Sequence, residues 1–304
     1  MDIRVLNYFL AVAREESISK ASQVLHITQP PLSRALIELE EEIGKKLLIR
    51  GSRKITLTEE GLLLRKRAAE IIALVKKTED ELTASDAEAI QGDIYIGCGE
   101  TDAMRLIART AAKLHDNYPD IKYHLFSGNA EDIHDKLEKG IFDFAVLIEA
   151  ADVSNYDYIR IPSLDVWGLL VRKDNPLAGK KEISPEDLWD IPLLTSRQAS
   201  DNNEFSGWLK KEFDQLNIIG TYNLLYNASL MVDEGFGSAL CLDGLINTSG
   251  NSNLCFRPLA PRKTAGMDII WKKYQVFTKA AQKFLEQLQE DFDFSIRNNC
   301  NKKP

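Results

Sequence analysis

The strongest constraint on the fold is a pair of short helical patterns separated by only two residues. The first pattern covers residues 20–25 and the second covers residues 29–43. His26-Ile27 is too short a connection for antiparallel packing, so the two helices must cross steeply. We expect Ser19 and Thr28 to cap these helices, because a hydroxyl accepts an orphan N–H of the first turn. This arrangement predicts a helix-turn-helix.

The flanking sequence extends this motif on both sides. A helix is expected over 5–15, and Pro30 and Pro31 fall in the first turn of the third helix, where a missing N–H costs little. No acidic residue occurs from Ile43 to Lys54, and strands over 47–49 and 55–57 would form a hairpin with residues 50–53 at its tip. Such a wing would hold its cations, Arg50, Arg53 and Lys54, against phosphates or a minor groove. A basic segment alone is usually a solvated face, but this order of features favours DNA binding.

Four segments of this region closely resemble the N-terminal signature of LysR-type transcriptional regulators. They are Phe9-Leu10-Ala11-Val12-Ala13, Ser17-Ile18-Ser19-Lys20-Ala21-Ser22, residues 25–34 (LHITQPPLSR) and Leu57-Thr58-Glu59-Glu60-Gly61. The resemblance implies that Gln29, Ser33 and Arg34 face the major groove, with Arg50 and Arg53 in the wing. The departures, Glu16 for the usual Gly, Ser22 for Ala and Leu48 for Phe, lie off that face. The expected DNA contacts are Ser19, Thr28, Gln29, Pro30, Pro31, Ser33, Arg34, Arg50, Arg53 and Lys54.

A single long helical pattern follows, over residues 58–87. Its apolar positions, Ala68, Ile71, Val75 and Leu82, form a seam that needs a partner. The simplest partner is a second copy of the helix, and the alternative is packing against its own domain. The family resemblance implies a dimer that places two DNA-binding domains on a two-fold symmetric double-stranded operator. It also implies a homotetramer. We therefore expect a winged helix-turn-helix domain at 1–58, a linker helix at 59–89 and an effector domain at 90–304.

The C-terminal two hundred residues alternate strands with helices, which predicts a mainly parallel sheet covered by helices. The fold class is α/β overall, with two α/β subdomains at about 92–161 plus 266–304, and 162–265. The expected strands are 93–98, 121–126, 142–148, two strands over 156–172 broken at Pro162-Ser163, 193–195, 222–226, 238–242 and 267–271. The expected helices are 102–117, 131–139, 203–216, 228–234 and 275–291.

Polar segments follow the carboxyl ends of four strands, where ligands bind in such sheets. The resemblance implies a periplasmic-type binding domain that holds a small effector in the cleft lined by these loops. Helix capping is the alternative role for Thr101, Asn129 and Asn227. Arg197 is the candidate carboxylate partner, while Glu100 would oppose an anion, so the charge of the ligand stays open. The candidate effector residues are Gly99, Glu100, Thr101, Ser127, Gly128, Asn129, Thr195, Ser196, Arg197, Tyr226 and Asn227.

Composition narrows the classes of protein to which the chain can belong. The 38 Lys plus Arg against 46 Asp plus Glu exclude a uniformly basic surface, and the four cysteines lie too far apart for a disulfide framework or a zinc site. No GxSxG, HExxH, P-loop or dinucleotide fingerprint is present, so no enzyme activity, metal or cofactor is expected. A redox sensor based on Cys98 is one alternative, and a small-molecule-binding protein is another. No apolar stretch approaches the ~18–20 residues of a membrane span, and a cytoplasmic location is expected.

Overall fold

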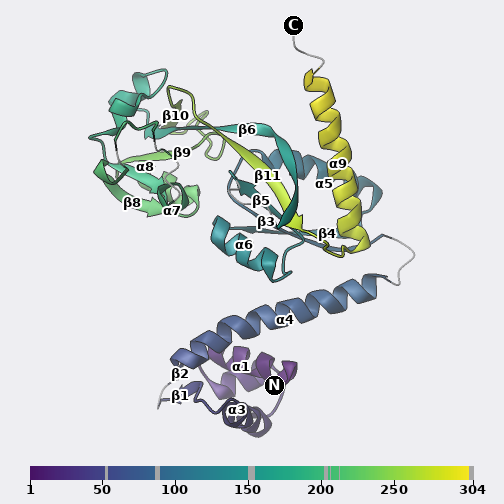
Figure 1. The fold of residues 1–304 in the computed structure, drawn as a ribbon. Helices are drawn as coiled ribbons and strands as arrows, with labels where there is room; N and C mark the ends of the chain where they lie inside the picture. Colours follow the sequence, from purple (N-terminus) through teal and green to yellow (C-terminus); the bar gives the residue numbers. More distant parts are fainter. Residues whose placement is uncertain are drawn as a thin grey trace. The chain divides into compact units, whose positions relative to one another are not determined.

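The computed structural model describes residues 1–51, 54–85, 90–149, 155–201, 205, 207–211 and 213–300, apart from the side chains of 80, 81, 83–85, 200, 201, 214 and 293–300. The chain divides into two compact units, Met1–Thr83 and Ala84–Pro304. Figure 1 colours both units along the sequence. Each unit has its own hydrophobic core and is described separately below.

The first unit contains three short helices, a small hairpin and a long helix. Its elements are α1 (Ile3–Glu15), α2 (Ile18–Val24), α3 (Gln29–Ile43), β1 (Leu48–Arg50), β2 (Ile55–Leu57) and α4 (Glu59–Ser85). The first three helices pack around a core that includes Phe9, Val12, Ala21, Leu32 and Leu36. The hairpin pairs Leu48 with Leu57 and Arg50 with Ile55 in antiparallel register. This order of elements is a winged helix-turn-helix followed by one long helix.

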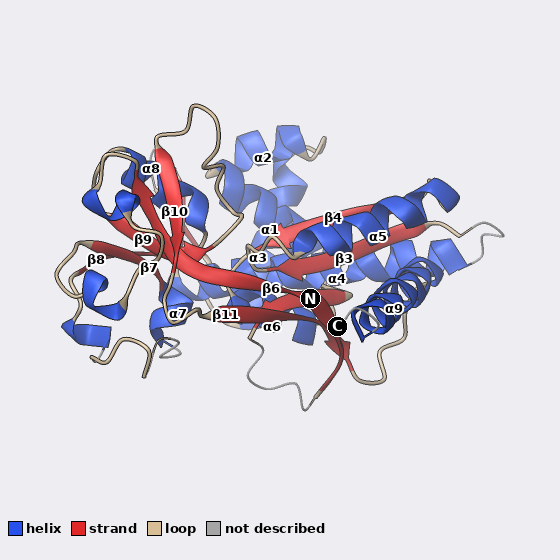
Figure 2. Ribbon diagram, turned by 90° about the horizontal axis from the view of Figure 1, so that it is seen from above, coloured by secondary structure: helices blue, strands red, loops and turns tan. Residues whose placement is uncertain are grey.

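The second unit is built on a mixed sheet whose strand order is β4-β3-β5-β11-β6-β9-β7-β8, with β10 paired to β6. The strands are β3 (Gly92–Cys98), β4 (Ile121–Ser127), β5 (Phe144–Ile148), β6 (Tyr156–Arg172), β7 (Leu193–Ser196), β8 (Ile218–Tyr222), β9 (Ser238–Leu242), β10 (Leu254–Pro258) and β11 (Thr264–Lys272). β3 is parallel to β4 and β5, and β7 is parallel to β8 and β9. The antiparallel strands β6 and β11 run between these two parallel groups (Figure 2).

Helices cover the sheet on both faces. They are α5 (Met104–Asn117), α6 (Ala130–Glu138), α7 (Arg197–Asp201), α8 (Leu225–Asp233) and α9 (Lys279–Cys300), with short 3-10 helices at Pro176–Gly179, Pro185–Leu188 and Phe213–Gln215. Alternation along β5 explains how the first parallel group is layered. Phe144 and Val146 pack in the cluster that contains α5 and α9, whereas Ala145 and Leu147 pack in the cluster that contains α6. Both faces of β5 are therefore buried, as a parallel strand requires.

Three expectations for the second unit were wrong, and one strand was missed. The break at Pro162-Ser163 does not divide a strand, because β6 is continuous from Tyr156 to Arg172. The register between β6 and β11 shifts between Gly266 and Asp268, which face Leu164 and Arg160 of β6. Pro162 therefore lies at an irregularity of the ladder, where its missing N–H is tolerated.

The helix expected at 203–216 is also absent from the described part of that segment. Residues 207–211 form turns and bends, and a 3-10 turn covers Phe213–Gln215. Positive φ angles at Gly207 and Lys210, 75° and 55°, interrupt any helix there. Phe205 and Leu209 are nevertheless buried, so their helix-like spacing reflects core packing and not a helix.

The strand expected at 222–226 lies four residues earlier, as β8, and α8 already begins at Leu225. Gly220 lies within this strand. In the sheet it lies so close to Leu194 that a Cβ would be 2.8 Å from Leu194 Cδ2. A glycine in a strand often marks such a close approach. β10 was not expected from the sequence at all.

Candidate DNA interface and effector cleft

Helix α3 has a polar, solvent-facing surface because its apolar side chains occupy the opposite face. Leu32, Leu36 and Leu39 recur at helical spacing and are buried in the first unit. Gln29 and Arg34 are exposed, and Ser33, Pro30 and Pro31 lie near them in sequence. Amide and guanidinium groups are suited to the base edges of a major groove, where they form paired hydrogen bonds.

The hydroxyl groups before the two crossing helices have different roles from those expected. Ser17, not Ser19, is the N-cap of α2, and its Oγ accepts a hydrogen bond from Lys20 N at 3.3 Å. Ser19 Oγ instead donates to Gln29 Oε1 at 3.2 Å. Thr28 is the N-cap residue of α3, but its side chain makes no capping hydrogen bond. Ser19 therefore joins α2 to the first residue of α3 and orients the Gln29 amide.

The wing is tied to the end of α1. Ile55 N donates to the carbonyl of Glu16 at 2.9 Å, and Lys54 Nζ lies 3.3 Å from the Glu16 carboxylate. Arg50 is exposed at the end of β1, and Gly51 N donates to Lys54 O at 3.1 Å. Arg53 lies outside the described residues. The wing thus presents Arg50 to solvent, while Lys54 shares its charge with Glu16.

Glu40 connects α3 to the wing, and the sequence analysis missed this role. It is 6% exposed. Its Oε1 accepts hydrogen bonds from Leu47 N at 2.8 Å and Leu48 N at 3.1 Å, and Lys46 Nζ lies 2.9 Å from Oε2. Burial alone would raise the pKa of Glu40, but Lys46 and the two backbone N–H groups together hold this pKa below its ordinary value. The carboxylate therefore stays ionised and fixes the start of β1 against α3.

A cleft cavity of about 60 Å³ lies in the second unit where the carboxyl ends of β3 and β7 meet loops from the other strands. The cavity is lined by Gly99, Glu100, Gly128, Asn129, Ile148, Trp167, Ser196, Gln198, Tyr222, Asn223, Leu225, Leu242 and Leu245. An adjoining cavity of about 330 Å³ shares four of these residues and adds Ala130, Glu131 and Arg197. Apolar walls with several amide and hydroxyl groups are typical of a small-molecule site.

Two side chains cross the cleft to the first turns of helices on its opposite side. Glu100, just after β3, accepts a hydrogen bond from the backbone N–H of Leu225 at the start of α8. Gln198 of α7 accepts one from Ala130 N at the start of α6, at 3.3 Å. The N-cap residue Asn129 also accepts from Asp132 N at 2.8 Å. The contacts of Glu100 and Gln198 connect the two sides of the cleft, whereas the Asn129 contact only caps α6.

The residues expected from the sequence are only partly gathered at this cleft. Gly99, Glu100, Gly128, Asn129 and Ser196 line its cavity, and Arg197 lines the adjoining one. The remaining expected residues do not line either cavity: Thr101, Ser127, Thr195, Tyr226 and Asn227.

Local structure explains why Tyr226 and Thr101 do not line these cavities. Tyr226 lies within α8 with its side chain 64% exposed, because β8 ends earlier than expected and Asn223 takes the place after the strand. Thr101 is buried, and its Oγ1 donates to Asp165 Oδ2 at 2.6 Å. The apolar residues of the cavity wall, such as Trp167 and Leu242, were missed. In the sequence, an apolar strand residue that lines a cavity looks the same as one that packs in the core.

The ionisable groups behind the cleft lie in a negative environment. Burial raises the pKa of Asp165, and nearby Asp102 and Asp243 raise it further, against the hydrogen bonds from Thr101 and the Asp102 N–H. Burial also raises the pKa of the Cys98 thiol, and Glu100 adds to this effect. Cys98 is 4% exposed and its Sγ lies 3.6 Å from the carbonyl oxygen of Phe126. These conditions disfavour a Cys98 thiolate.

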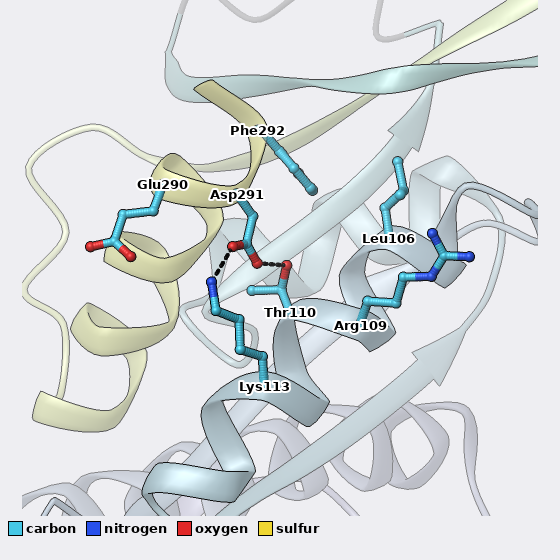
Figure 3. Close-up of a pocket in the computed structure, with 7 residues that line it drawn as sticks. All are labelled: Leu106, Arg109, Thr110, Lys113, Glu290, Asp291 and Phe292. Atoms are coloured by element: carbon cyan, nitrogen blue, oxygen red, sulfur yellow. Dashed lines mark hydrogen bonds and ion pairs between the residues drawn. The ribbon is translucent and has the colours of Figure 1, made fainter. Parts of the chain in front are cut away.

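A separate cavity of about 500 Å³ lies between α5 and α9 (Figure 3). Asp291 Oδ1 accepts from Lys113 Nζ at 2.7 Å, and Oδ2 accepts from Thr110 Oγ1 at 2.8 Å. Leu106, Arg109 and other residues of the two helices complete its walls. Because the central carboxylate is already satisfied by its neighbours, we interpret this region as a helix–helix contact and not as the effector site.

Within the described residues, no three His, Cys, Asp or Glu side chains are grouped as metal ligands. No described helix combines the length and the apolar character that a membrane-spanning segment requires.

Comparison with known families agrees with the architecture of both units. Residues 3–62 match the profile of the bacterial regulatory helix-turn-helix protein, lysR family, and residues 87–293 match that of the LysR substrate binding domain. The chain belongs to the LysR family of transcriptional regulators. The first profile ends near the start of the long helix α4 and the second begins just after its end, so each profile lies mainly in one of the two compact units.

Individual relatives are more distant. The hydrogen peroxide-inducible genes activator of Dickeya chrysanthemi is 30% identical over 195 residues, which are 64% of this chain and 63% of that protein. The match thus spans less than two thirds of this relative's length. YvbU of Bacillus subtilis is 24% identical over 296 residues, 96% of this chain and 99% of that regulator. Full-length CbnR, crystallised with its target DNA, has a TM-score of 0.75 at 18% identity over 96% of this chain and all of that one. This likeness shows the LysR fold.

Proposed function

We propose that this LysR-family protein is an oligomeric regulator that binds a two-fold symmetric operator and responds to a small polar molecule in its cleft. The polar face of α3 is the observation that carries the DNA-binding part. Gln29 is exposed at the first turn and is oriented by Ser19, while the buried leucines hold the opposite face in the core. We assign base reading to Gln29, Ser33 and Arg34, and phosphate contacts to Arg50 and Arg53 of the wing.

Helix α4 supports the oligomeric part of the proposal. It is 27 residues long, about 40 Å at ~1.5 Å per residue. Leu82 of the expected seam is 66% exposed in the single chain, whereas Ala68 is buried; Leu63 and Leu74, on a neighbouring face of the helix, are 60% and 42% exposed. A second copy of the helix would cover such side chains and place two winged domains on successive major grooves. CbnR, which shares the fold, was crystallised in full length with its target DNA.

The cleft supports the effector part. Its walls are apolar and also carry amide and hydroxyl groups. It lies between two parallel groups of strands, where ligands bind in open α/β sheets. A ligand that binds one arrangement of these groups more tightly than another shifts the protein toward that arrangement. The operator affinity then changes through the coupling between the two sites.

A thiol-based peroxide response is the second candidate, because several relatives are named hydrogen peroxide-inducible genes activators. The surroundings of Cys98 do not favour it. Cys241 and Cys255 are buried as well, and burial also raises the pKa of Cys241 strongly. The side chain of Cys300 is outside the described residues. Loss of operator response to peroxide in Cys98→Ser would establish this second candidate.

The decisive experiment compares Gln29→Ala with Arg50→Ala on operator DNA and on unrelated DNA. Gln29→Ala should relax discrimination at one base position by ~1–3 kcal/mol. Arg50→Ala should weaken binding about equally on all sequences and reduce the salt slope by about one. Lys122→Ala, which removes a cation from β4 of the second unit, is the matched control and should change neither quantity. If neither Gln29→Ala nor Arg50→Ala changes the footprint on the operator, the assignment of α3 and the wing to DNA contact is refuted.

A further inference from the structure

The side chains around the cleft cavity carry one kind of charge. Among the described residues that line it, Glu100 alone is charged at neutral pH, and the rest are apolar, amide or hydroxyl side chains. Arg197, the cation expected to bind a carboxylate, lines the adjoining cavity together with Glu131. The part of a ligand that enters this cavity of about 60 Å³ therefore meets a carboxylate and not a guanidinium group.

Glu100 also occupies the position that an anionic ligand would use. The first backbone N–H groups of a helix attract negative charge, and the N-cap residue of α8, Leu224, supplies no side-chain cap. The Glu100 carboxylate accepts from Leu225 N and fills this position from across the cleft. A ligand carboxylate would have to displace Glu100 and then lie beside it, which like charges oppose.

The charges behind the cavity have the same sign. Asp165 is 6% exposed and lies near Asp102 and Asp243, which raise its pKa beyond the effect of burial. Asp102 is paired with Arg105 at 2.7 Å, which offsets much of its charge, so Glu100 is the main source of negative charge at the cavity. The carboxylate of Glu100, set among apolar walls, thus favours a cation in the cavity.

Trp167 contributes a buried hydrogen-bond donor that has no acceptor in the described part of the chain. This side chain lines the cavity and is 6% exposed, yet its indole Nε1 has no hydrogen-bond partner among the described residues. A buried N–H without an acceptor is costly, and a ligand oxygen would remove that cost. The cavity therefore lacks two complementary groups, a cation for Glu100 and an acceptor for Trp167.

We propose that the effector of this protein is a small molecule that carries an ammonium group and a hydrogen-bond acceptor, with Glu100 selecting the ammonium group and Trp167 Nε1 donating to the acceptor. This inference rests on the proposed function, in which the cleft is the effector site. It assigns the specificity of the cleft to Glu100, and it predicts that Arg197 is not a carboxylate partner in this cavity.

Three probes that share one amide acceptor and differ in charge test the proposal. They are 3-aminopropanamide, a cation at neutral pH, propanamide, which is neutral, and succinamate, an anion. Binding to the full-length protein is followed by the indole N–H signal of Trp167, which is assigned among the four tryptophans by its loss in Trp167→Phe. We expect 3-aminopropanamide to bind about tenfold more tightly than propanamide, with succinamate weakest.

The variant Glu100→Gln keeps an acceptor for Leu225 N and removes the charge. We expect it to bring the three affinities within about threefold of one another. Glu131→Gln, which removes a carboxylate from the adjoining cavity, is the matched control and should keep the preference. The proposal is overturned if succinamate binds wild type as tightly as the cation, if Glu100→Gln keeps the preference, or if no probe shifts Trp167 at about 100 mM.

Failure of the proposed function gives a different result. DNA binding is tested by Gln29→Ala and Arg50→Ala, which lie in the other compact unit and do not depend on the probes. A cation that shifts the Trp167 signal without changing operator binding would support this site and contradict the regulatory role of the cleft.

Discussion

Replacing Glu40 by alanine should loosen the wing of the first unit more than any exposed substitution on α3. The Glu40 carboxylate accepts hydrogen bonds from the backbone N–H groups of Leu47 and Leu48, which are both buried. Leu47 immediately precedes β1, and Leu48 is its first residue. Alanine cannot accept these hydrogen bonds, and water has little access to the two N–H groups. The change therefore removes the link between α3 and the wing while leaving the apolar core intact.

The magnitude follows from the contacts. A buried N–H left without an acceptor costs ~1–3 kcal/mol, and a hydrogen bond to a charged group contributes ~1.5–3 kcal/mol. The ion pair adds less than about 1 kcal/mol, because the Lys46 side chain is 74% exposed. We expect Glu40→Ala to cost ~3 kcal/mol locally, whereas Glu40→Gln keeps a neutral acceptor and should cost ~1 kcal/mol.

Native-state hydrogen exchange of the peptide 44–50 measures this cost in the full chain. A loss of ~3 kcal/mol corresponds to exchange about 150-fold faster for the Leu47 and Leu48 amides. Glu41→Ala is the matched control, because Glu41 is exposed on the same helix and such substitutions change stability by about ±0.5 kcal/mol or less. Exchange in Glu40→Ala that stays within about threefold of Glu41→Ala would refute the role assigned to this carboxylate.

Three further predictions concern pH and the second unit. Because the folded pKa of Glu40 lies below its ordinary value of 4.5, its contribution to stability is fully present above about pH 4.5 and is lost as the pH falls through the folded value. The protection factors of the 44–50 amides, which correct for the intrinsic exchange rate at each pH, should therefore fall on acidification, and less so in Glu40→Gln. Phe144→Ala should cost ~3–5 kcal/mol in urea unfolding followed by fluorescence, since Phe144 is fully buried and its ring centroid lies 5.4 Å from that of Phe284; a cost below 1 kcal/mol would contradict this packing. Thr101→Val should cost ~1–3 kcal/mol by leaving buried Asp165 without its hydroxyl donor, and Thr101→Ser should restore most of it in the same assay.

The first unit was largely predictable because its signals are local. The third helix begins at Gln29 and ends at Ile43 as expected, and the hairpin lies within one residue of its predicted strands. Helix caps, prolines and a short turn determine such elements within a few residues of sequence. The expected caps are one exception, since Ser17 and not Ser19 caps α2 and the Thr28 side chain makes no capping hydrogen bond. Glu40 is the other, because its partners are seven and eight residues away. Only the folded backbone brings them together.

The second unit was predictable in its fold class but not in its site. Strands such as Ser238–Leu242 are apolar runs and were found from the sequence, whereas β8 was expected four residues too late. The polar segments after β3 and before α6 do reach the cleft. The contact from Glu100 to Leu225 joins residues 125 positions apart, so no local pattern could have revealed it.

The charge distribution along the chain also limits how the cleft could act on DNA. From Gly92 onward there are 24 Lys plus Arg and 31 Asp plus Glu, so this part carries a net charge of −7 and is not itself suited to phosphates. One ammonium group changes that charge by only one unit, and salt screens its field beyond about 8 Å. Regulation by a bound cation must therefore proceed through geometry. In the described structure the two parallel groups of strands are connected by β6 and β11, and the Glu100–Leu225 contact spans the same two groups at the cleft. A ligand that competes for Glu100 thus acts on a contact that fixes the groups relative to each other, and this makes the cleft an effective position for control.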